Sequence, residues 1–263
     1  MRKIALALST ILALSSCSQK DLSVNPSSDT KIVRKNEREG IVDLRRLVEE
    51  SEVEEAWVYI SPTVEDAWYY HPIIPEWHDI GLEAKTKDGM SSVELDIPKI
   101  KGLGDLYSSI HVWHIHPQKA IRELYSSFLD DPPKGLTKEQ FAEKITLEGA
   151  IPSRNDLTLA IYFNCILNSQ RSHYDRYFLA SHYGITEFQP ISSNLVNVCQ
   201  SSEPSLSLKA KKLGLLLEAS YDDFRMRTKI KQAVNTRTSA ELFHKEYMKI
   251  TFWPYAALPT DLK

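Results

Sequence analysis

Several features that would indicate particular classes of protein are missing from this sequence. Of its 263 residues, 32 are basic and 35 are acidic, so the formal net charge is −3, and no basic run is interleaved with aromatic residues. This balance gives no electrostatic reason to expect a nucleic acid as a partner. The chain also has no internal repeat, no GxxxxGK[ST] loop and no GxGxxG loop, so the common phosphate-binding signatures are absent.

The N-terminal apolar run is too short for a permanent transmembrane helix. Two basic residues precede residues 4–14, and these eleven residues cannot cross a bilayer as a helix. The run ends in the sequence LSSC at residues 14–17, which resembles a bacterial lipobox, where cleavage occurs before a cysteine that is then lipidated. The pattern predicts a signal peptide over 1–17, followed by a flexible polar tether over 18–38.

The lipobox resemblance implies that the protein is anchored to a membrane and does not span it. Cys17 would carry the lipid. Ser18 follows it, and in such lipoproteins a serine at this position usually directs the protein to the outer membrane. We therefore expect a protein of the bacterial cell envelope, held on the outer membrane and facing the periplasm.

Cysteine is otherwise scarce. Only Cys165 and Cys199 remain after Cys17. An exported protein meets an oxidising compartment, so these two residues are candidates for a disulfide. Two buried free thiols are the alternative, because a sequence does not give the distance between them. A disulfide that closes this loop would stabilise the fold by about 3–4 kcal/mol.

The order of apolar patterns favours a mixed α/β domain. Helical and strand-like segments alternate along the chain, and a Ser-Arg-Asn-Asp sequence precedes one of the helical segments. The expected elements are a helix over 40–51, strands over 52–60 and 67–73, a hairpin over 82–97, a strand over 107–117, helices within 118–150, a helix from 153, a strand pair over 176–190 and helices over 205–250.

Residues 113–117 read WHIHP and contain the first candidate for chemistry. In a strand, His114 and His116 point to the same face, and Pro117 ends the strand. Two imidazoles on one face can bind one metal ion. A pair of histidines on an exposed strand is the alternative.

A zinc site with three protein ligands needs one more histidine or carboxylate. Asp156 is the best candidate, in the first turn of the helix predicted from Ser153. The two residues are three apart and therefore share a helix face, so the serine hydroxyl could donate to an oxyanion while the aspartate binds metal. Taken alone, Ser-x-x-Asp is also an ordinary signature of a helix start.

The two motifs together resemble the JAMM/MPN+ (Mov34/RadC-like) zinc metallopeptidase family. HxHP is present as His114-Ile115-His116-Pro117, SxxD follows as Ser153-Arg154-Asn155-Asp156, and the strand pair over 176–190 matches the family's usual continuation. The resemblance covers about residues 40–190. It implies a JAMM/MPN-like mixed sheet flanked by helices, which we assign to residues 39–200, with a helical C-terminal extension over 201–263.

The resemblance also implies one zinc ion held by His114, His116 and Asp156, with Ser153 stabilising the oxyanion. The family has an upstream glutamate as general base. Glu54 is the preferred residue because it shares strand parity with an aliphatic face, while Glu55 and Glu65 are the alternatives.

The chain departs from the family pattern between the two motifs. Residues 118–152 separate them, where family members have a much shorter connection. This predicts a helical insertion over 118–150 beside the site. It could close over the site as a lid, or it could displace Asp156 and leave no metal site.

These features predict an envelope-anchored metallopeptidase or isopeptidase that acts on a protein or peptide substrate. A catalytically silent MPN-like scaffold that binds a partner is the main alternative. A structural lipoprotein with an incidental HxH sequence is the third interpretation.

Overall fold

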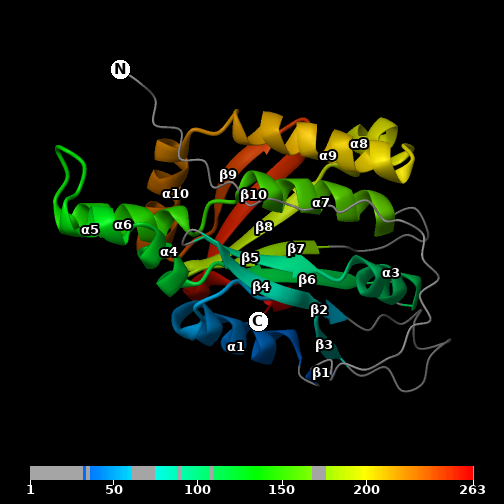
Figure 1. Ribbon diagram of the computed structural model, residues 1–263, viewed down its shortest axis with the longest axis horizontal. Coiled ribbons are helices and arrows are strands. Elements are labelled where there is room, and N and C mark those ends of the chain that lie inside the picture. Colours follow the sequence, from blue (N-terminus) through cyan, green and yellow to red (C-terminus); the bar gives the residue numbers. More distant parts are fainter. Residues whose placement is uncertain are drawn as a thin grey trace.

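Strand-forming segments from the whole chain join into one mixed sheet (Figure 1). The computed structural model describes residues 32–33, 36–60, 75–87, 90–106, 109–167 and 176–262. Within them the strand order is β1-β3-β2-β6-β7-β8-β10-β9, and only the β6–β7 pair is parallel. The strands of this sheet are β1 (Ile32–Val33), β2 (Ala56–Ile60), β3 (Glu76–Asp79), β6 (Ile110–Ile115), β7 (Arg176–Ala180), β8 (Gly184–Pro190), β9 (Ala240–Lys245) and β10 (Met248–Pro254).

Helices cover both faces of this sheet, so the expected mixed α/β class is confirmed. In Figure 1, α1 lies on one side of the sheet and α7 on the other, with α8 and α9 outside α7. The helices are α1 (Glu37–Glu50), α3 (Ile97–Leu106), α4 (Gln118–Leu124), α5 (Ser126–Asp130), α6 (Lys138–Glu148), α7 (Arg154–Leu167), α8 (Ser192–Cys199), α9 (Glu203–Glu218) and α10 (Asp223–Thr236). No helix among these described residues is both long and apolar enough to cross a bilayer.

Alternation along the central strands creates two separate apolar cores, because successive side chains point to opposite faces. The core on the α1 side contains aromatic residues of β2 and β6, and the core on the α7 side contains aliphatic ones. On the α1 side lie Trp57, Tyr59, Trp113 and Ile115, and on the α7 side lie Ala56, Val58, Ile60 and Val112.

Several predicted elements end at different residues in the structure. The tether was expected to extend to residue 38, but α1 begins at Glu37, where Asn36 forms a capping box with Glu39. The hairpin over 82–97 is present as β4 (Gly81–Lys87) and β5 (Met90–Leu95). The strand predicted over 67–73, the two turn residues Asp88-Gly89, the signal peptide and Cys17 lie outside the described residues.

The helical C-terminal extension is only partly correct. Residues 203–236 form α9 and α10, as expected, but residues 240–254 form the β9–β10 hairpin. In β10, Met248, Ile250 and Phe252 are buried, which is the alternation of a strand with one face on the core. The hairpin adds to β8, whose backbone groups would otherwise form an open edge, so tertiary pairing decides the structure of this segment.

The predicted insertion consists of the three helices α4, α5 and α6, and the start of α4 meets the end of α6. The side-chain amide of Gln118, at the start of α4, donates to the hydroxyl of Thr146 near the end of α6 (2.9 Å), and both groups are buried. A small core of Tyr125, Phe141 and Ile145 holds the helices together. Because its two ends are joined, the insertion adds residues to the fold without separating the elements on either side of it.

The structure contains a disulfide between Cys165 in α7 and Cys199 at the end of α8. Replacement of both cysteines by alanine should lower the free energy of unfolding by about 3–4 kcal/mol, because the cross-link restricts the unfolded chain. Denaturant unfolding of the oxidised protein and of the double variant measures the difference. Equal stability of the two proteins would mean that the disulfide does not form in solution.

Candidate metal centre

Strand β6 presents two imidazoles to the α7 side of the sheet. Ala56 pairs with His114, and because Ala56 faces the aliphatic core, His114 and His116 face that side as well. Beyond the strand, the backbone N–H of His116 donates to the carbonyl oxygen of Ala180 (3.0 Å), so its position remains tied to the sheet. Pro117 then precedes the first residue of α4.

The first turn of α7 holds Asp156 over this face. The backbone N–H of Ser153 donates to Asp156 Oδ2 (2.6 Å), and the backbone N–H of Asp156 faces Ser153 Oγ (3.4 Å). This reciprocal arrangement is that of a capping box, with aspartate in the position of the usual glutamate. The Ser-x-x-Asp sequence therefore starts the helix, as its pattern predicts, and also fixes the orientation of the carboxylate.

The three predicted ligands lie together. Asp156 Oδ1 is 3.1 Å from His114 Nε2, and Asp156 Oδ2 is 3.7 Å from His116 Nε2. One ligand atom from each residue lies within 4.8 Å of the others. Two atoms that are each about 2.05 Å from a tetrahedral zinc ion are roughly 3.3 Å apart. The distance from Asp156 Oδ1 to His114 Nε2 is close to this value.

The donor groups also have the chemistry that a zinc ion requires. His114 Nε2 is buried and, although it is close to Asp156, it makes no aligned hydrogen bond. A buried ring nitrogen that points toward a carboxylate oxygen without a hydrogen bond fits two ligands directed at a common ion. Nitrogen and oxygen donors of this kind are typical zinc ligands.

The carbonyl oxygen of Gly149 fixes the tautomer of His116. It lies 3.0 Å from His116 Nδ1, so the N–H is on Nδ1 and the lone pair of Nε2 points toward Asp156. Burial lowers the pKa of His116, although Asp156 acts in the opposite direction. The imidazole is therefore neutral at pH 7, the form that binds metal. Sequence analysis did not find Gly149, because a backbone carbonyl leaves no residue-type signal.

The end of the insertion is fixed at the same place. The hydroxyl of Thr186 in β8 donates to the carbonyl oxygen of Ala150 (2.7 Å), next to the Gly149–His116 contact. A side chain at Gly149 would meet Ile121 Cδ1 at 2.6 Å, so this position also permits close packing of α6 on α4. The insertion thus does not displace Asp156 from the histidines.

Charge balance around Asp156 supports the same grouping. Burial acts to raise the pKa of Asp156, but His114, His116 and the backbone of Ser153 together outweigh it, and the pKa is below its usual value. Asp156 is therefore ionised at neutral pH. An ionised carboxylate in this buried position needs a cation or hydrogen-bond donors to compensate its charge.

Glu54 lies on the same face as the histidines. The β2–β6 ladder continues beyond β2, because the N–H of Ile115 donates to the carbonyl oxygen of Glu55 (3.1 Å). The register that pairs Ala56 with His114 therefore places Glu54 opposite His116, and Glu55 points to the other face. Glu65 lies outside the described residues.

The surroundings of Glu54 favour its protonated form. Burial raises the pKa of Glu54 well above its ordinary value, and the nearby charge of Asp156 raises it further. A hydrogen bond with the backbone of Val93 in β5 acts in the opposite direction. A buried carboxyl whose pKa is moved toward neutrality, beside a set of metal ligands, has the properties of a proton-transfer group.

Comparisons with known proteins identify no relative, since no protein-family model, curated protein or solved structure matches this chain.

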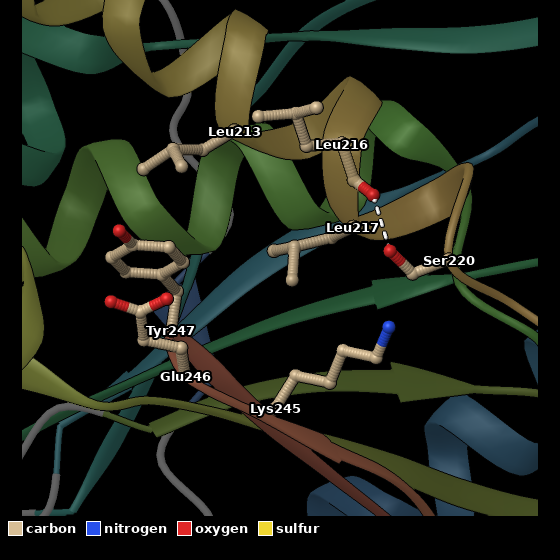
Figure 2. A pocket seen from close by; sticks show the side chains of 7 residues that line it. All are labelled: Leu213, Leu216, Leu217, Ser220, Lys245, Glu246 and Tyr247. Carbon is tan, nitrogen blue, oxygen red and sulfur yellow. Dashed lines mark hydrogen bonds between the residues drawn. The ribbon is translucent and has the colours of Figure 1, made fainter.

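A separate hollow of about 270 Å³ lies between α9 and the β9–β10 turn (Figure 2). Leu213, Leu217 and Tyr247 are among its lining residues, and none of the three candidate ligands is. The function therefore has to be argued from the triad and its surroundings.

Loss of a ligand should remove zinc without unfolding the protein. We expect the native protein to retain about one zinc ion per chain after loading and dialysis, and His114→Ala, His116→Ala and Asp156→Asn to retain little. The asparagine keeps an oxygen that can accept from the N–H of Ser153, so α7 keeps its cap. Metal analysis with a circular dichroism check measures both properties.

The control for this experiment is His244→Ala, because His244 is half exposed on β9 and outside the triad. It should keep the zinc content of the native protein. Full zinc retention by His114→Ala and His116→Ala would contradict the assignment.

Glu54→Gln should stabilise the metal-free protein at neutral pH. A carboxyl whose pKa is raised in the folded state binds its proton more tightly there than in the unfolded chain, so folding is opposed once the pH exceeds the unfolded value of about 4.3. The advantage of Glu54→Gln should therefore be present at pH 7 and shrink near pH 4. Urea unfolding with a chelator at both pH values measures it, with Glu55→Gln as control. Equal stability at pH 7 would contradict the burial of this carboxyl.

Proposed function

We propose that this protein is a zinc-dependent metallopeptidase of the JAMM/MPN+ type, anchored to the bacterial envelope, which hydrolyses an amide bond of a protein or peptide. The observation that supports it most is the convergence of His114, His116 and Asp156 from two distant motifs. The HxHP and SxxD motifs are separated by the long insertion, so their meeting is not a consequence of proximity in the sequence.

The residues of the site have separate roles in this proposal. His114, His116 and Asp156 would hold a zinc ion, which would supply Lewis acidity toward the scissile carbonyl and would lower the pKa of water from about 15.7 to about 7. Glu54 accepts the proton of the attacking water and passes it to the leaving nitrogen, for which its raised pKa is suited. Ser153 donates its hydroxyl hydrogen to the oxyanion, since its oxygen faces the N–H of Asp156 as an acceptor.

The position of the insertion supports a role in substrate access. Its first helix begins directly after Pro117, and its last ends next to Gly149, whose carbonyl contacts His116. Salt bridges from α10 hold α6, namely Arg227 to Glu148 (2.8 Å) and Lys231 to Glu143 (2.7 Å). The insertion is thus a wall beside the triad that is tied to the C-terminal helices.

The lipid anchor proposed from residues 14–17 would place this activity on the outer membrane, facing the periplasm. Substitution of Cys17 by serine should then abolish lipid labelling of the precursor. Proteins and peptides of the envelope are the substrate class that such a location offers. The disulfide between Cys165 and Cys199 is compatible with an oxidising compartment.

Glu54→Gln should keep zinc and lose hydrolysis. The amide cannot accept a proton, and removal of a general base typically lowers the rate by about 10²–10⁴-fold. The substrate is found first by screening a peptide library with the zinc-loaded native protein, and the variants are then compared by kcat/KM. Glu55→Gln is the matched control, and it should change the rate little because it faces the other side of the sheet.

The two glutamates also separate the possible outcomes. A large loss in Glu55→Gln with a normal Glu54→Gln would move the base to the neighbouring residue. Normal zinc binding without any hydrolysis by the native protein would favour the silent MPN-like scaffold.

A further inference from the structure

Helix α9 has apolar side chains on the face that points away from the domain. Its inner face packs on α7 and consists of Leu206, Ala210, Gly214 and Leu217, all of them buried. Three further leucines lie seven or eight residues apart on the opposite face, a spacing that brings them together on one side of the helix. They are Leu208, Leu215 and Leu216, with exposed fractions of 55%, 50% and 63%.

Exposed apolar side chains are concentrated in this part of the molecule. Among the described residues, seven large apolar side chains are exposed, and five of them lie in α8, α9 or the first turn of α10. Single exposed apolar residues are ordinary, but a group on successive helices indicates an interaction surface. Figure 1 shows α8 and α9 on the outside of the fold. Leu216 also lines the hollow of Figure 2, together with Lys245 of β9.

Lysines lie between the exposed leucines of α9. Lys211 and Lys212 follow Leu208 by three and four residues, so they share its face. Neither lysine has a carboxylate partner within the described part of the chain. Residues 192–236, which include α8, α9 and α10, contain seven basic and four acidic side chains, although the whole chain has a net charge of −3. The outer face of α9 is therefore both apolar and basic.

This combination favours an anionic lipid surface over a second copy of the chain. In a two-fold antiparallel pair of α9 helices centred on this face, the two Lys212 side chains would meet in the middle, and lysine is depleted from the centres of protein interfaces. A lipid surface accommodates both residue types. The lysine stem lies beside the leucines at the level of the headgroups, and the ammonium group reaches a phosphate.

The anchor predicted at Cys17 would keep the domain close to such a surface. Residues 18–32 can span at most about 50 Å when fully extended. Ile32 belongs to β1 at the edge of the sheet, and α7 and α9 form the next two layers, each about 10 Å further out. The length of this segment therefore lets the α9 side of the domain reach the membrane that holds the anchor.

We infer that the outer face of α9 docks on an anionic lipid surface. This inference concerns binding and does not depend on the metal site or on hydrolysis. The docking face consists of Leu208, Lys211, Lys212, Leu215 and Leu216. Because Gly214 allows α9 to pack closely on Arg154, docking would hold the first turn of α7 about one helix diameter, roughly 10 Å, from the headgroups. The candidate metal centre would then lie close to the membrane.

The test places a photo-cross-linking residue on either side of the molecule. Benzoylphenylalanine replaces Leu215 or, as the control, Val42, which is 64% exposed on α1. The full-length protein is incorporated into phosphatidylcholine vesicles with or without phosphatidylglycerol, and the adducts formed on irradiation are identified by mass. We expect a lipid adduct at position 215 in the vesicles that contain phosphatidylglycerol, and little adduct at position 42 or without the anionic lipid.

Charge reversal separates the docking face from the net charge of the protein. The double variant Lys211→Glu, Lys212→Glu should lower the ratio of docked to undocked protein by about 25-fold or more, because each basic residue near an anionic surface contributes about fivefold. The matched control is Lys134→Glu with Lys138→Glu, which makes the same change in charge at two exposed positions between α5 and the first turn of α6. This control should leave the adduct at position 215 unchanged.

The other possible results would overturn the inference. A protein dimer cross-linked through position 215, in place of a lipid adduct, would assign the face to a second copy. Equal lipid adducts at positions 215 and 42, or equal adducts in both kinds of vesicle, would mean that the contact with lipid is not specific to this face. Equal losses in the two double variants would assign binding to net charge alone. Absence of any adduct at position 215 would mean that α9 stays in solvent.

Discussion

The candidate site depends on a helical insertion whose last residues lie next to its first residues. The HxHP strand and the α7 turn meet only because the chain between them returns to its starting point. Three contacts enforce this return, from Gln118 to Thr146, from His116 to Gly149 and from Thr186 to Ala150. The contact between His116 and Gly149 also orients a candidate ligand. The same hydrogen bond therefore closes the insertion and fixes the tautomer of His116. A substitution that loosens the α4–α6 pair would therefore change the candidate metal site before it changes the sheet.

Electrostatics give the second constraint on the site. Burial acts to raise the pKa of both Asp156 and Glu54. The pKa of Asp156 is nevertheless below its usual value, whereas the pKa of Glu54 is above it. Asp156 is held ionised by the two histidines and the helix cap, while Glu54 is shifted toward its protonated form. Separation of two neighbouring carboxyls in this way is a common basis for dividing ligand and proton-transfer roles. A divalent cation would compensate the charge of Asp156 directly.

The C-terminal residues take part in the fold more closely than an added extension would. The β10 strand pairs with β8, α9 packs on the first turn of α7, and Arg227 of α10 binds Glu148 of the insertion. The residues after 200 therefore hold α7 and the insertion from outside.

Local patterns in the sequence were sufficient for the elements that carry the motifs. The parity of His114 and His116 and the helix start at Ser153 depend on neighbouring residues only, and they agree with the structure. The choice of Glu54 over Glu55 followed from the same parity. The helical prediction for 240–254 was wrong because Ile250, Thr251 and Phe252 favour a strand, and pairing with β8 stabilises it.

What the sequence determined by itself was which residue types lie on which face of their own strand or helix, because alternation and helical periodicity are local. Only the tertiary structure decided whether those faces meet. The approach of Asp156 to the histidines, the carbonyl of Gly149 on His116 and the hydrogen bond of Arg154 with Glu218 all join residues far apart in the chain. Such contacts depend on loop closure and packing, and a backbone carbonyl leaves no pattern in the amino-acid sequence.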